Sequence, residues 1–258
     1  HEVPDTNDEI SRLTGSFNKM LSRLDDAFTA QKQFSASAAH ELRTPLAVMQ
    51  TNLEVFARKK TPTIEEYQDI FGMIQNQTER LSHLSEVLLD MTGIQSVERS
   101  DFISLAELTD EVCCDLASIA DQKKVELIQE EGDCTVTGSY LLLYRAVYNL
   151  VENAIKYNHS GGKVTVKISQ KKDLPAAHSK PTDYALVEVT DTGIGISPEF
   201  QEKIFDPFFR VDKSRSRAMG GAGLGLALVN EIARQHGGEV KVLKSNKNGS
   251  TIALILPL

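Results

Sequence analysis

The stretch FSASAAHELRTPL, residues 34–46, lies in what otherwise reads as a long helix, and it contains a histidine followed closely by an acid, a threonine and a proline. On a helix that turns about 100° per residue, the apolar residues around Leu42 share one face, and His40 lies almost opposite it. We therefore expect the His40 side chain to point to solvent. A neutral imidazole offers a nucleophilic nitrogen, which Glu41 could serve as general base, and Thr44 could orient a water molecule. Considered alone, the histidine would also suit an ordinary solvated helix face.

Two asparagines, a lysine and a tyrosine repeat at helical spacing further along the chain, in NLVENAIKY at residues 149–157. Asn149, Asn153, Lys156 and Tyr157 would share one helix face. An amide oxygen is a suitable hard ligand for Mg²⁺, and a lysine one turn further on can meet a phosphate group. Buried amides are costly without partners, so the pattern indicates a ligand site, although a solvated polar helix face would have the same spacing.

Three further clusters follow this helix. DTGIG at residues 191–195 comes directly after an apolar strand, and its glycines let a ligand approach the backbone closely, although a simple turn has the same sequence. In FDPFFR, residues 205–210, the aromatic side chains can dock a loop, and Arg210 could reach a phosphate. GAGLGL at residues 221–226 opens a helix whose N-terminal amides can face a phosphate.

The elements that would carry the histidine follow from hydrophobic periodicity. Apolar residues recur at alternating steps of three and four over residues 10–27 and again over residues 67–91, a heptad pattern that favours pairing of helices. Pro62 cannot continue a helix but suits the first turn of the next one. We expect residues 9–95 to form helix, turn and helix, and two such hairpins from two chains to make a four-helix bundle.

From about Asp101 the pattern changes to that of an α/β domain. Helical periodicity marks residues 105–119, 139–158 and 223–236. Strand-like alternation marks residues 164–168, 184–189 and 252–256. We expect residues 171–183 to form a hairpin loop and residues 197–222 to form a long mobile loop, of the kind that closes over a site.

The composition excludes other classes of protein. The chain of 258 residues has a formal net charge of −8, which argues against nonspecific binding to nucleic acid. Its three cysteines show no metal-ligand spacing and fit a reducing compartment. No apolar run approaches the ~18 residues of a membrane span. The first residue is His1 rather than Met, so we expect an excised piece, with room for a membrane anchor upstream.

The stretch FSASAAHELRTPL resembles the H-box of sensor histidine kinases, in which the histidine accepts a phosphoryl group. Downstream of it, an N-box, a DxGxG box, an aromatic box and a GxGLG box occur in the order found in that family, over nearly the whole chain. DEISRL and FNKM, at residues 8–13 and 17–20, resemble the end of a HAMP linker, which connects a transmembrane helix to the kinase. Asn158 and His159 depart from the family pattern, where Ser or Thr followed by Pro is common.

The resemblance implies a multidomain fold. Residues 1–28 would be the C-terminal part of a HAMP linker or signal helix, and residues 29–96 an all-α hairpin that dimerises as a four-helix bundle and carries the phosphoacceptor. Residues 101–258 would be an α/β sandwich ATP-binding domain of the Bergerat type, shared with DNA gyrase, the Hsp90 chaperones and MutL. The whole protein would be a homodimer anchored in the cell membrane, with this part on the cytoplasmic side.

The resemblance also implies roles for individual residues. His40 would be the phosphoacceptor and Glu41 the general base, and Thr44 would place water for phosphatase activity toward a phosphorylated response regulator. Asn149 and Arg210 would act in catalysis, and Asn153 would hold Mg²⁺. The residues implied to bind ATP are Asn149, Asn153, Lys156, Tyr157, Asp191, Gly193, Gly195, Ile196, Phe205, Gly221, Gly223, Leu224, Gly225 and Leu226.

One residue bears on the type of reaction. Relatives that hydrolyse ATP resemble one another in having a glutamate at the start of the N-box, where this chain has Asn149. An amide cannot deprotonate water, so we expect direct hydrolysis to be poor. Two alternatives remain: a non-catalytic dimeric scaffold in which nucleotide only sets conformation, and an ATP-driven clamp like the chaperones. The H-box and Asn149 speak against the clamp, and the completeness of the expected site speaks against the scaffold.

Overall fold

The structure is a computed structural model that describes residues 6–94, 97–171, 183–211 and 222–258. The chain divides into two compact units, residues 1–78 and residues 79–258, here called the helical unit and the α/β unit. Most of the expected hairpin loop, part of the expected mobile loop and Gly221 lie outside the described residues.

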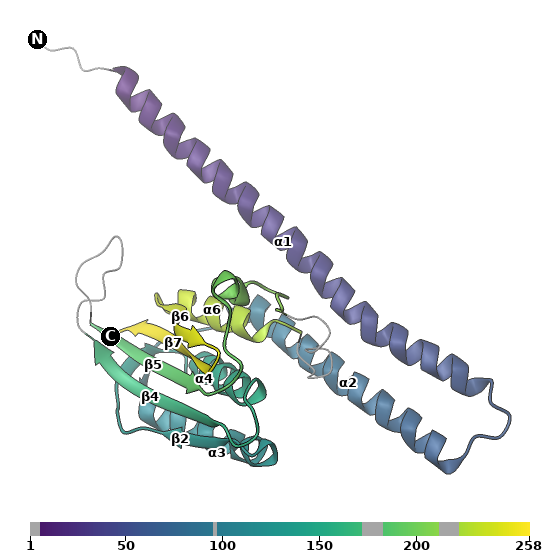
Figure 1. Cartoon of the computed structure of the whole chain (residues 1–258). Coiled ribbons are helices and arrows are strands. Elements are labelled where there is room, and N and C mark those ends of the chain that lie inside the picture. Colours follow the sequence, from purple (N-terminus) through teal and green to yellow (C-terminus); the bar gives the residue numbers. More distant parts are fainter. Residues whose placement is uncertain (1–5, 95–96, 172–182, 212–221) are drawn as a thin grey trace, which may run out of the picture. The chain divides into compact units, whose positions relative to one another are not determined.

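The helical unit is built from two long helices, as the heptad patterns predicted (Figure 1). Helix α1 (Thr6–Ala57) runs for 52 residues and continues through Pro45, and helix α2 (Ile64–Gly93) extends from this unit into the α/β unit. Among the described residues, no helix combines the length and the apolar content that crossing a membrane requires.

The turn between α1 and α2 is fixed by local contacts. The backbone N–H of Glu66 donates to Thr63 Oγ1 at 3.3 Å, and the Thr63 N–H donates to Glu66 Oε2 at 3.0 Å, which is a reciprocal capping box. The rings of Phe56 and Tyr67 meet edge to face, with their centroids 5.0 Å apart. These contacts begin α2 directly after the predicted break, so the helix–turn–helix prediction is confirmed.

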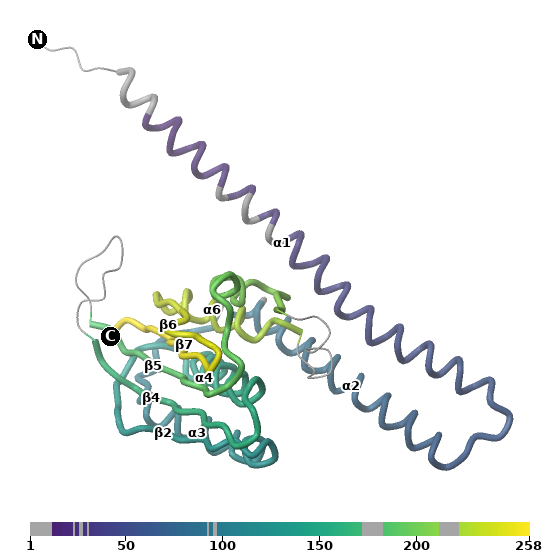
Figure 2. Tube along the Cα trace, in the orientation of Figure 1, coloured from purple at the N-terminus to yellow at the C-terminus, as the bar shows by residue number. Residues whose placement is uncertain are grey.

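The α/β unit contains one mixed sheet and a separate strand pair. Its elements are β1 (Asp101–Ser104), α3 (Leu105–Lys123), β2 (Glu126–Gln129), β3 (Thr135–Gly138), α4 (Tyr140–Lys156), β4 (Lys163–Lys171), β5 (Tyr184–Asp191), η2 (Pro198–Phe200), η3 (Lys203–Phe205), α6 (Gly225–Gln235), β6 (Glu239–Asn246) and β7 (Gly249–Pro257). Among the described residues, the sheet order is β2-β4-β5-β7-β6, and β1 pairs with β3. The chain's path through these strands can be followed in Figure 2.

Pairing in the sheet is antiparallel except between β2 and β4. Helices α3, α4 and α6 cover one face of it (Figure 1). The three strands predicted from alternation correspond to β4, β5 and β7, and the three predicted helices correspond to α3, α4 and α6. These six predictions are confirmed. The described part of the expected mobile loop contains two short 3₁₀ turns, η2 and η3, which the sequence interpretation did not include.

Helix α4 is strongly amphipathic. Its buried side chains are Leu142, Leu143, Ala146, Val147, Leu150, Val151, Ala154 and Ile155. The last part of α2 also packs in the α/β unit, because Leu84 and Val87 are buried and Asp90 forms an ion pair with Arg145 of α4. With its apolar face in the core, α4 turns its asparagines toward a cavity in this unit.

Candidate active site

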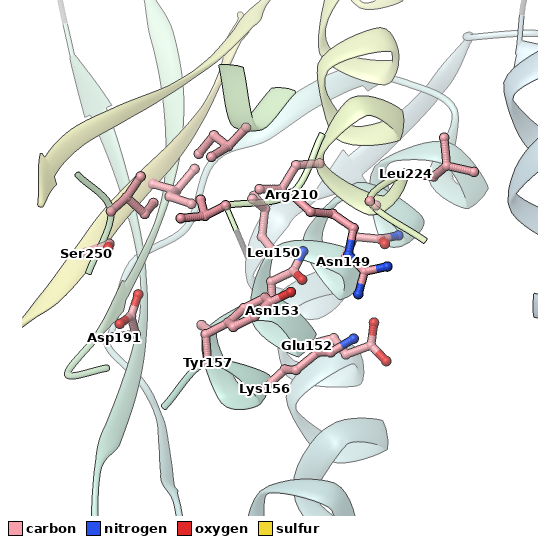
Figure 3. Close-up of a pocket in the computed structure, with 18 of the residues that line it drawn as sticks. Asn149, Leu150, Glu152, Asn153, Lys156, Tyr157, Asp191, Arg210, Leu224 and Ser250 are labelled. Atoms are coloured by element: carbon pink, nitrogen blue, oxygen red, sulfur yellow. The ribbon is translucent and has the colours of Figure 1, made fainter. Parts of the chain in front are cut away.

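The α/β unit encloses a cavity of about 500 Å³. Its walls come from α4, the end of β5, the start of β7, the segment before α6 and the first turn of α6, with three side chains of α2 at one side. Figure 3 shows that the polar side chains lining it converge from these separate elements. Of the residues predicted to bind ATP, those that line it are Asn149, Asn153, Lys156, Tyr157, Asp191, Gly195, Ile196, Gly223, Leu224, Gly225 and Leu226.

Helix α4 contributes Asn149, Asn153 and Lys156 from one face, as their spacing indicated, and Tyr157 follows as its C-cap residue. The amide of Asn149 donates to the backbone oxygen of Arg145 at 2.8 Å, which leaves its Oδ1 directed into the site. Lys156 Nζ lies 5.9 Å from the centroid of the Tyr157 ring. Burial lowers the pKa of Lys156, and the positive charge of Arg210 acts in the same direction, while the carboxylate of Glu152 opposes it.

Asp191 is the last residue of β5 and lies at the opposite end of the cavity. Burial raises its pKa above the ordinary value, and hydrogen bonds from the backbone N–H groups of Gly193 and Ser250 oppose that shift. The Gly193 N–H donates to Asp191 Oδ1 at 2.7 Å. Ser250 lies on β7 directly opposite Asp191 of β5. It is buried and lines the cavity. The sequence interpretation missed Ser250, because nothing local shows which residue of β7 will face Asp191.

The cavity has two chemically different ends (Figure 3). At one end lie Asp191 and Ser250, and at the other lie Lys156, Glu152, Asn149 and Arg210, with Asn153 and Tyr157 between them. Apolar side chains of the lining include Leu150, Val189 and Ile252. Such a space fits an elongated ligand with a flat, hydrogen-bonding group at one end and negative charge at the other.

Two glycines at and just before the start of α6 allow close packing at the site, one against the asparagines and one against the segment of Phe209. A Cβ at Gly225 would lie 2.6 Å from Asn149 Oδ1 and 3.6 Å from Asn153 Nδ2. Gly223 has a φ of +74°, in the left-handed region that side chains disfavour, and a Cβ there would meet the backbone of Phe209 at 2.8 Å. The GxG spacing therefore reflects both backbone conformation and space beside the site.

Some predicted residues are placed elsewhere. Phe205 lies in η3 and does not line the cavity, whereas Phe209 does, and its ring centroid is 5.8 Å from that of Phe200. Gly193 lies behind the wall, against Asp191 and the Tyr157 carbonyl. Arg210 lines the cavity next to Phe209. The aromatic box thus contributes a different ring from the one the resemblance implied.

A magnesium ion would fit the donor set at this site. In the ranges that the structure describes, no group of three or more His, Cys, Asp or Glu side chains is placed to hold a metal ion. The cavity instead offers the amide oxygens of Asn149 and Asn153. Mg²⁺ is commonly bound by one or two protein oxygens together with water and substrate phosphates, so these amides suit it.

His40 belongs to the helical unit. Its side chain is exposed on α1, as the helical geometry predicted. Thr44 Oγ1 donates to the His40 carbonyl oxygen at 3.1 Å and keeps its lone pairs for a further donor. Beside it is an open hollow lined by His40, Arg43, Thr44, Ala47, Val48, Thr51 and Asn52.

Comparison with protein families gives two matches that follow the order of the units. The His Kinase A (phospho-acceptor) domain matches residues 30–96, and the histidine kinase-, DNA gyrase B- and HSP90-like ATPase family matches residues 138–258. Together they cover the exposed histidine and most of the cavity-bearing unit.

Individual relatives agree with these matches. The chain is 32% identical over 255 residues to the sensor histidine kinase CusS of Escherichia coli O157:H7, covering 96% of this chain and 50% of CusS. It is 32% identical over 257 residues to the signal transduction histidine-protein kinase ArlS of Staphylococcus aureus USA300, covering 96% of this chain and 53% of ArlS. The chain thus spans about half the length of these curated relatives.

A solved structure shows the same fold. Histidine kinase ThkA, in complex with response regulator protein TrrA, aligns with a TM-score of 0.67 at 22% identity, over 90% of this chain and 63% of that one. A helical phosphoacceptor hairpin followed by an α/β ATPase-like domain defines the class of protein. The chain belongs to the sensor histidine kinases of two-component systems.

Proposed function

We propose that this chain is the cytoplasmic part of a membrane-anchored sensor kinase that transfers the terminal phosphoryl group of ATP to His40. The phosphoryl group would then pass to an aspartate of a response regulator. The observation that carries the proposal is the convergence of Asn149, Asn153, Lys156 and Asp191 on one cavity, in a chain that also exposes a histidine on α1.

The two ends of the cavity match the two ends of ATP. The Asp191 carboxylate would accept a hydrogen bond from the adenine amine, and Tyr157 would flank the base. Lys156, Asn149 and Arg210 would contact the phosphates at the cationic end. Asn153 would hold Mg²⁺, which when bound neutralises charge on the phosphate oxygens. Phosphoryl transfer depends mostly on positioning and on such neutralisation, and the cavity provides groups for both.

The step itself needs a neutral imidazole. One ring nitrogen of His40 attacks the γ-phosphorus, an N–P bond forms, the bond to the bridging oxygen breaks, and its electron pair leaves with ADP. Glu41 would hold the proton on the other ring nitrogen and accept it as positive charge develops. Asn149 cannot deprotonate water, so the phosphoryl group is kept for the histidine. The α/β domain, residues 101–258, would swing on residues 96–100 to bring the nucleotide to His40.

The hollow beside His40 is where a receiver domain would dock. A phosphohistidine is labile and suits transfer onward to an aspartate. Thr44 would place a water molecule that removes the phosphoryl group from the phosphorylated regulator. Loss of regulator phosphate on mixing with the chain, compared between the unchanged protein and Thr44→Val, tests this phosphatase activity.

Dimerisation and signal input would both depend on α1. The exposed apolar residues of α1 would pair two chains as a homodimer. Residues 1–28 would be the end of a HAMP linker that receives the signal. The relatives CusS and ArlS are roughly twice as long as the aligned region, which supports a sensing and anchoring part outside this chain.

Incubation with γ-labelled ATP tests the central claim. We expect acid-labile, alkali-stable label on the unchanged chain and on His159→Gln, a matched change at another exposed histidine, but none on His40→Gln. Label that persists on His40→Gln would contradict the assignment of the phosphoacceptor. Free phosphate without protein label would indicate a chaperone-like clamp, and binding without either product would indicate a scaffold.

A further inference from the structure

Two polar side chains join the walls of the nucleotide cavity without having a part in the proposed chemistry. Asn158 comes directly after Tyr157 at the end of α4, and Thr192 comes directly after Asp191 at the end of β5. The Thr192 hydroxyl donates to Asn158 Oδ1 at 3.1 Å. This hydrogen bond links the backbone just beyond the two side chains that we expect to hold the base.

The link is braced by the first residue of β4. Asn158 Nδ2 donates to the Lys163 carbonyl oxygen at 3.0 Å, and the Lys163 N–H donates to Thr192 Oγ1 at 2.9 Å. The His159 N–H donates to Asn158 Oδ1 at 3.0 Å, which fixes the orientation of the amide because a backbone N–H can only donate. The side-chain atoms of Asn158 and Thr192 are therefore held from several directions.

The backbone segments on either side of the hydrogen bond between Thr192 and Asn158 are also in close contact with each other. The Ile194 N–H donates to the Tyr157 carbonyl oxygen at 3.3 Å. Gly193 passes so close to that carbonyl that any side chain there would collide with it. Asn158 is half-buried and lines the cavity itself. A shift of either wall would thus change the distance between Tyr157 and Asp191.

We propose that Asn158 and Thr192 are positioning residues that set the separation of Tyr157 and Asp191, and with it the selectivity of the site for adenine. The inference rests on the proposed function, in which Asp191 accepts a hydrogen bond from the base. Adenine presents an amine at that position, whereas guanine presents a carbonyl oxygen, which a carboxylate repels. Discrimination between the two purines therefore depends on where Asp191 is held.

The test uses the whole 258-residue chain and three substitutions. Asn158→Leu removes every hydrogen bond of the amide at similar size, and Thr192→Val removes only the hydroxyl. Thr190→Val is the matched control, because it lies on the same strand and loses a hydroxyl bond to Thr251, 3.0 Å long, that does not involve α4. Calorimetry gives the Kd for ATP and for GTP. The initial rate of labelling at a series of ATP concentrations gives KM and the maximal first-order rate constant of labelling, written kcat below.

We expect Asn158→Leu and Thr192→Val each to raise the Kd and KM for ATP about tenfold and to reduce the preference for ATP over GTP, since a modest misplacement of a binding group weakens binding. The kcat at saturating ATP should stay within about twofold, because the phosphate end is untouched. The double substitution should cost clearly less than the sum of the two single ones, because both remove the bond between Thr192 and Asn158. Thr190→Val should bind both nucleotides as the unchanged chain does.

Each other outcome overturns the inference. If the unchanged chain binds ATP and folded Thr192→Val binds it equally well with the same purine preference, the positioning role is wrong and the proposed function stands. Additive losses in the double substitution would show two independent effects instead of one link. If the unchanged chain binds no ATP, the proposed function fails as well. Thr192→Val keeps its backbone bond to the Lys163 oxygen, 3.1 Å long, so it should fold even if Asn158→Leu does not, which circular dichroism checks.

Discussion

Burial and hydrogen bonding shift the pKa of Asp191 in opposite directions. Burial favours its protonated form, while the N–H groups of Gly193 and Ser250 favour the carboxylate. The net result is a raised pKa, so the carboxyl takes up a proton at a higher pH than an exposed aspartate does. Only the ionised form can accept at both oxygens, and so can accept from these N–H groups and from an adenine amine together.

ATP affinity should therefore decrease as the pH falls toward the raised pKa of Asp191. We expect the Kd measured by calorimetry between pH 8 and pH 5 to rise on acidification in the unchanged chain. Asp191→Asn should raise the Kd at pH 8 by roughly 10- to 100-fold, because a hydrogen bond to a charged group contributes ~1.5–3 kcal/mol. The variant should show a flatter pH dependence, and equal slopes for the two proteins would contradict the role of this carboxyl.

The residues of the site differ in how far the sequence could predict them. Asn149, Asn153 and Lys156 lie on one helix and Tyr157 is its C-cap residue, so their common face follows from the helical repeat. Ser250 could not be predicted in the same way, because its position opposite Asp191 depends on the register of β5 and β7. Residue types within one element reveal a shared surface, but contacts across strands require the pairing.

At the scale of elements, α4 and α6 pack closely where Gly225 of α6 faces Asn149 of α4. A side chain at Gly225 would intrude on Asn149 Oδ1, although α6 begins at this residue and alanine is the better helix former. Helix propensity therefore favours alanine at residue 225, whereas the space beside Asn149 requires glycine.

Gly225→Ala should weaken nucleotide binding, because the new methyl group displaces the Asn149 amide. We expect the Kd for ATP to rise at least about tenfold, as for loss of a well-placed polar contact of ~1.4 kcal/mol. Gly72→Ala in α2 is a matched control, since a Cβ there meets no atom within 4 Å. That variant should bind ATP normally, and a normal Kd for Gly225→Ala would show that the asparagine can move aside without loss.

A histidine links the other ends of the same two helices. The Ser139 N–H, at the start of α4, donates to His236 Nε2 at 3.1 Å, and His236 Nδ1 lies 2.8 Å from the Ile232 carbonyl oxygen of α6. Only the neutral ring can accept from Ser139 while donating to Ile232. Burial lowers the pKa of His236, and the charge of Arg99 lowers it further, against the effect of the bond to Ile232.

The sign of the resulting pH dependence follows from which state binds the proton. Below the ordinary histidine value of 6.5, the unfolded chain takes up a proton that the folded chain resists, so the free energy of unfolding decreases as the pH falls. The effect is at most about 1.4 kcal/mol per pH unit. Urea unfolding followed by circular dichroism at pH 8, 6 and 5 should show this loss in the unchanged chain. His236→Gln should lose less over the same range, and parallel curves would exclude a contribution from His236.

The elements themselves were predictable where they are long and periodic. The heptads of α1 and α2 and the alternation of β4, β5 and β7 carry a clear signal. The short strands β1, β2 and β3 have four residues each, too few to show a period, and β6 has only one buried side chain in a mixed pattern. Their formation depends on neighbouring strands, which the local sequence does not encode.

At the scale of the whole molecule, the first part of α1 presents apolar side chains that a single chain leaves uncovered. Leu13, Phe17, Met20 and Leu24 are 71%, 52%, 58% and 52% exposed. They follow the alternating three- and four-residue steps of a coiled-coil seam, which two helices bury together. Such a row would be a liability for solubility in a monomer, and the proposed homodimer gives it a partner.

Phe17→Asp should therefore weaken the homodimer while leaving the nucleotide site intact. Burying a phenylalanine contributes ~1.5–3 kcal/mol, and a dimer loses two of them and gains two facing charges, so we expect the dimer Kd to rise at least about tenfold. Light scattering coupled to size exclusion, at a series of concentrations, gives that constant. Ser16→Asp, one position off the seam, adds the same charge and should leave the dimer unchanged. The Kd for ATP should be the same in all three proteins, because the cavity lies within the α/β unit. A dimer of Phe17→Asp as tight as that of the unchanged chain would show that another surface holds the two chains together.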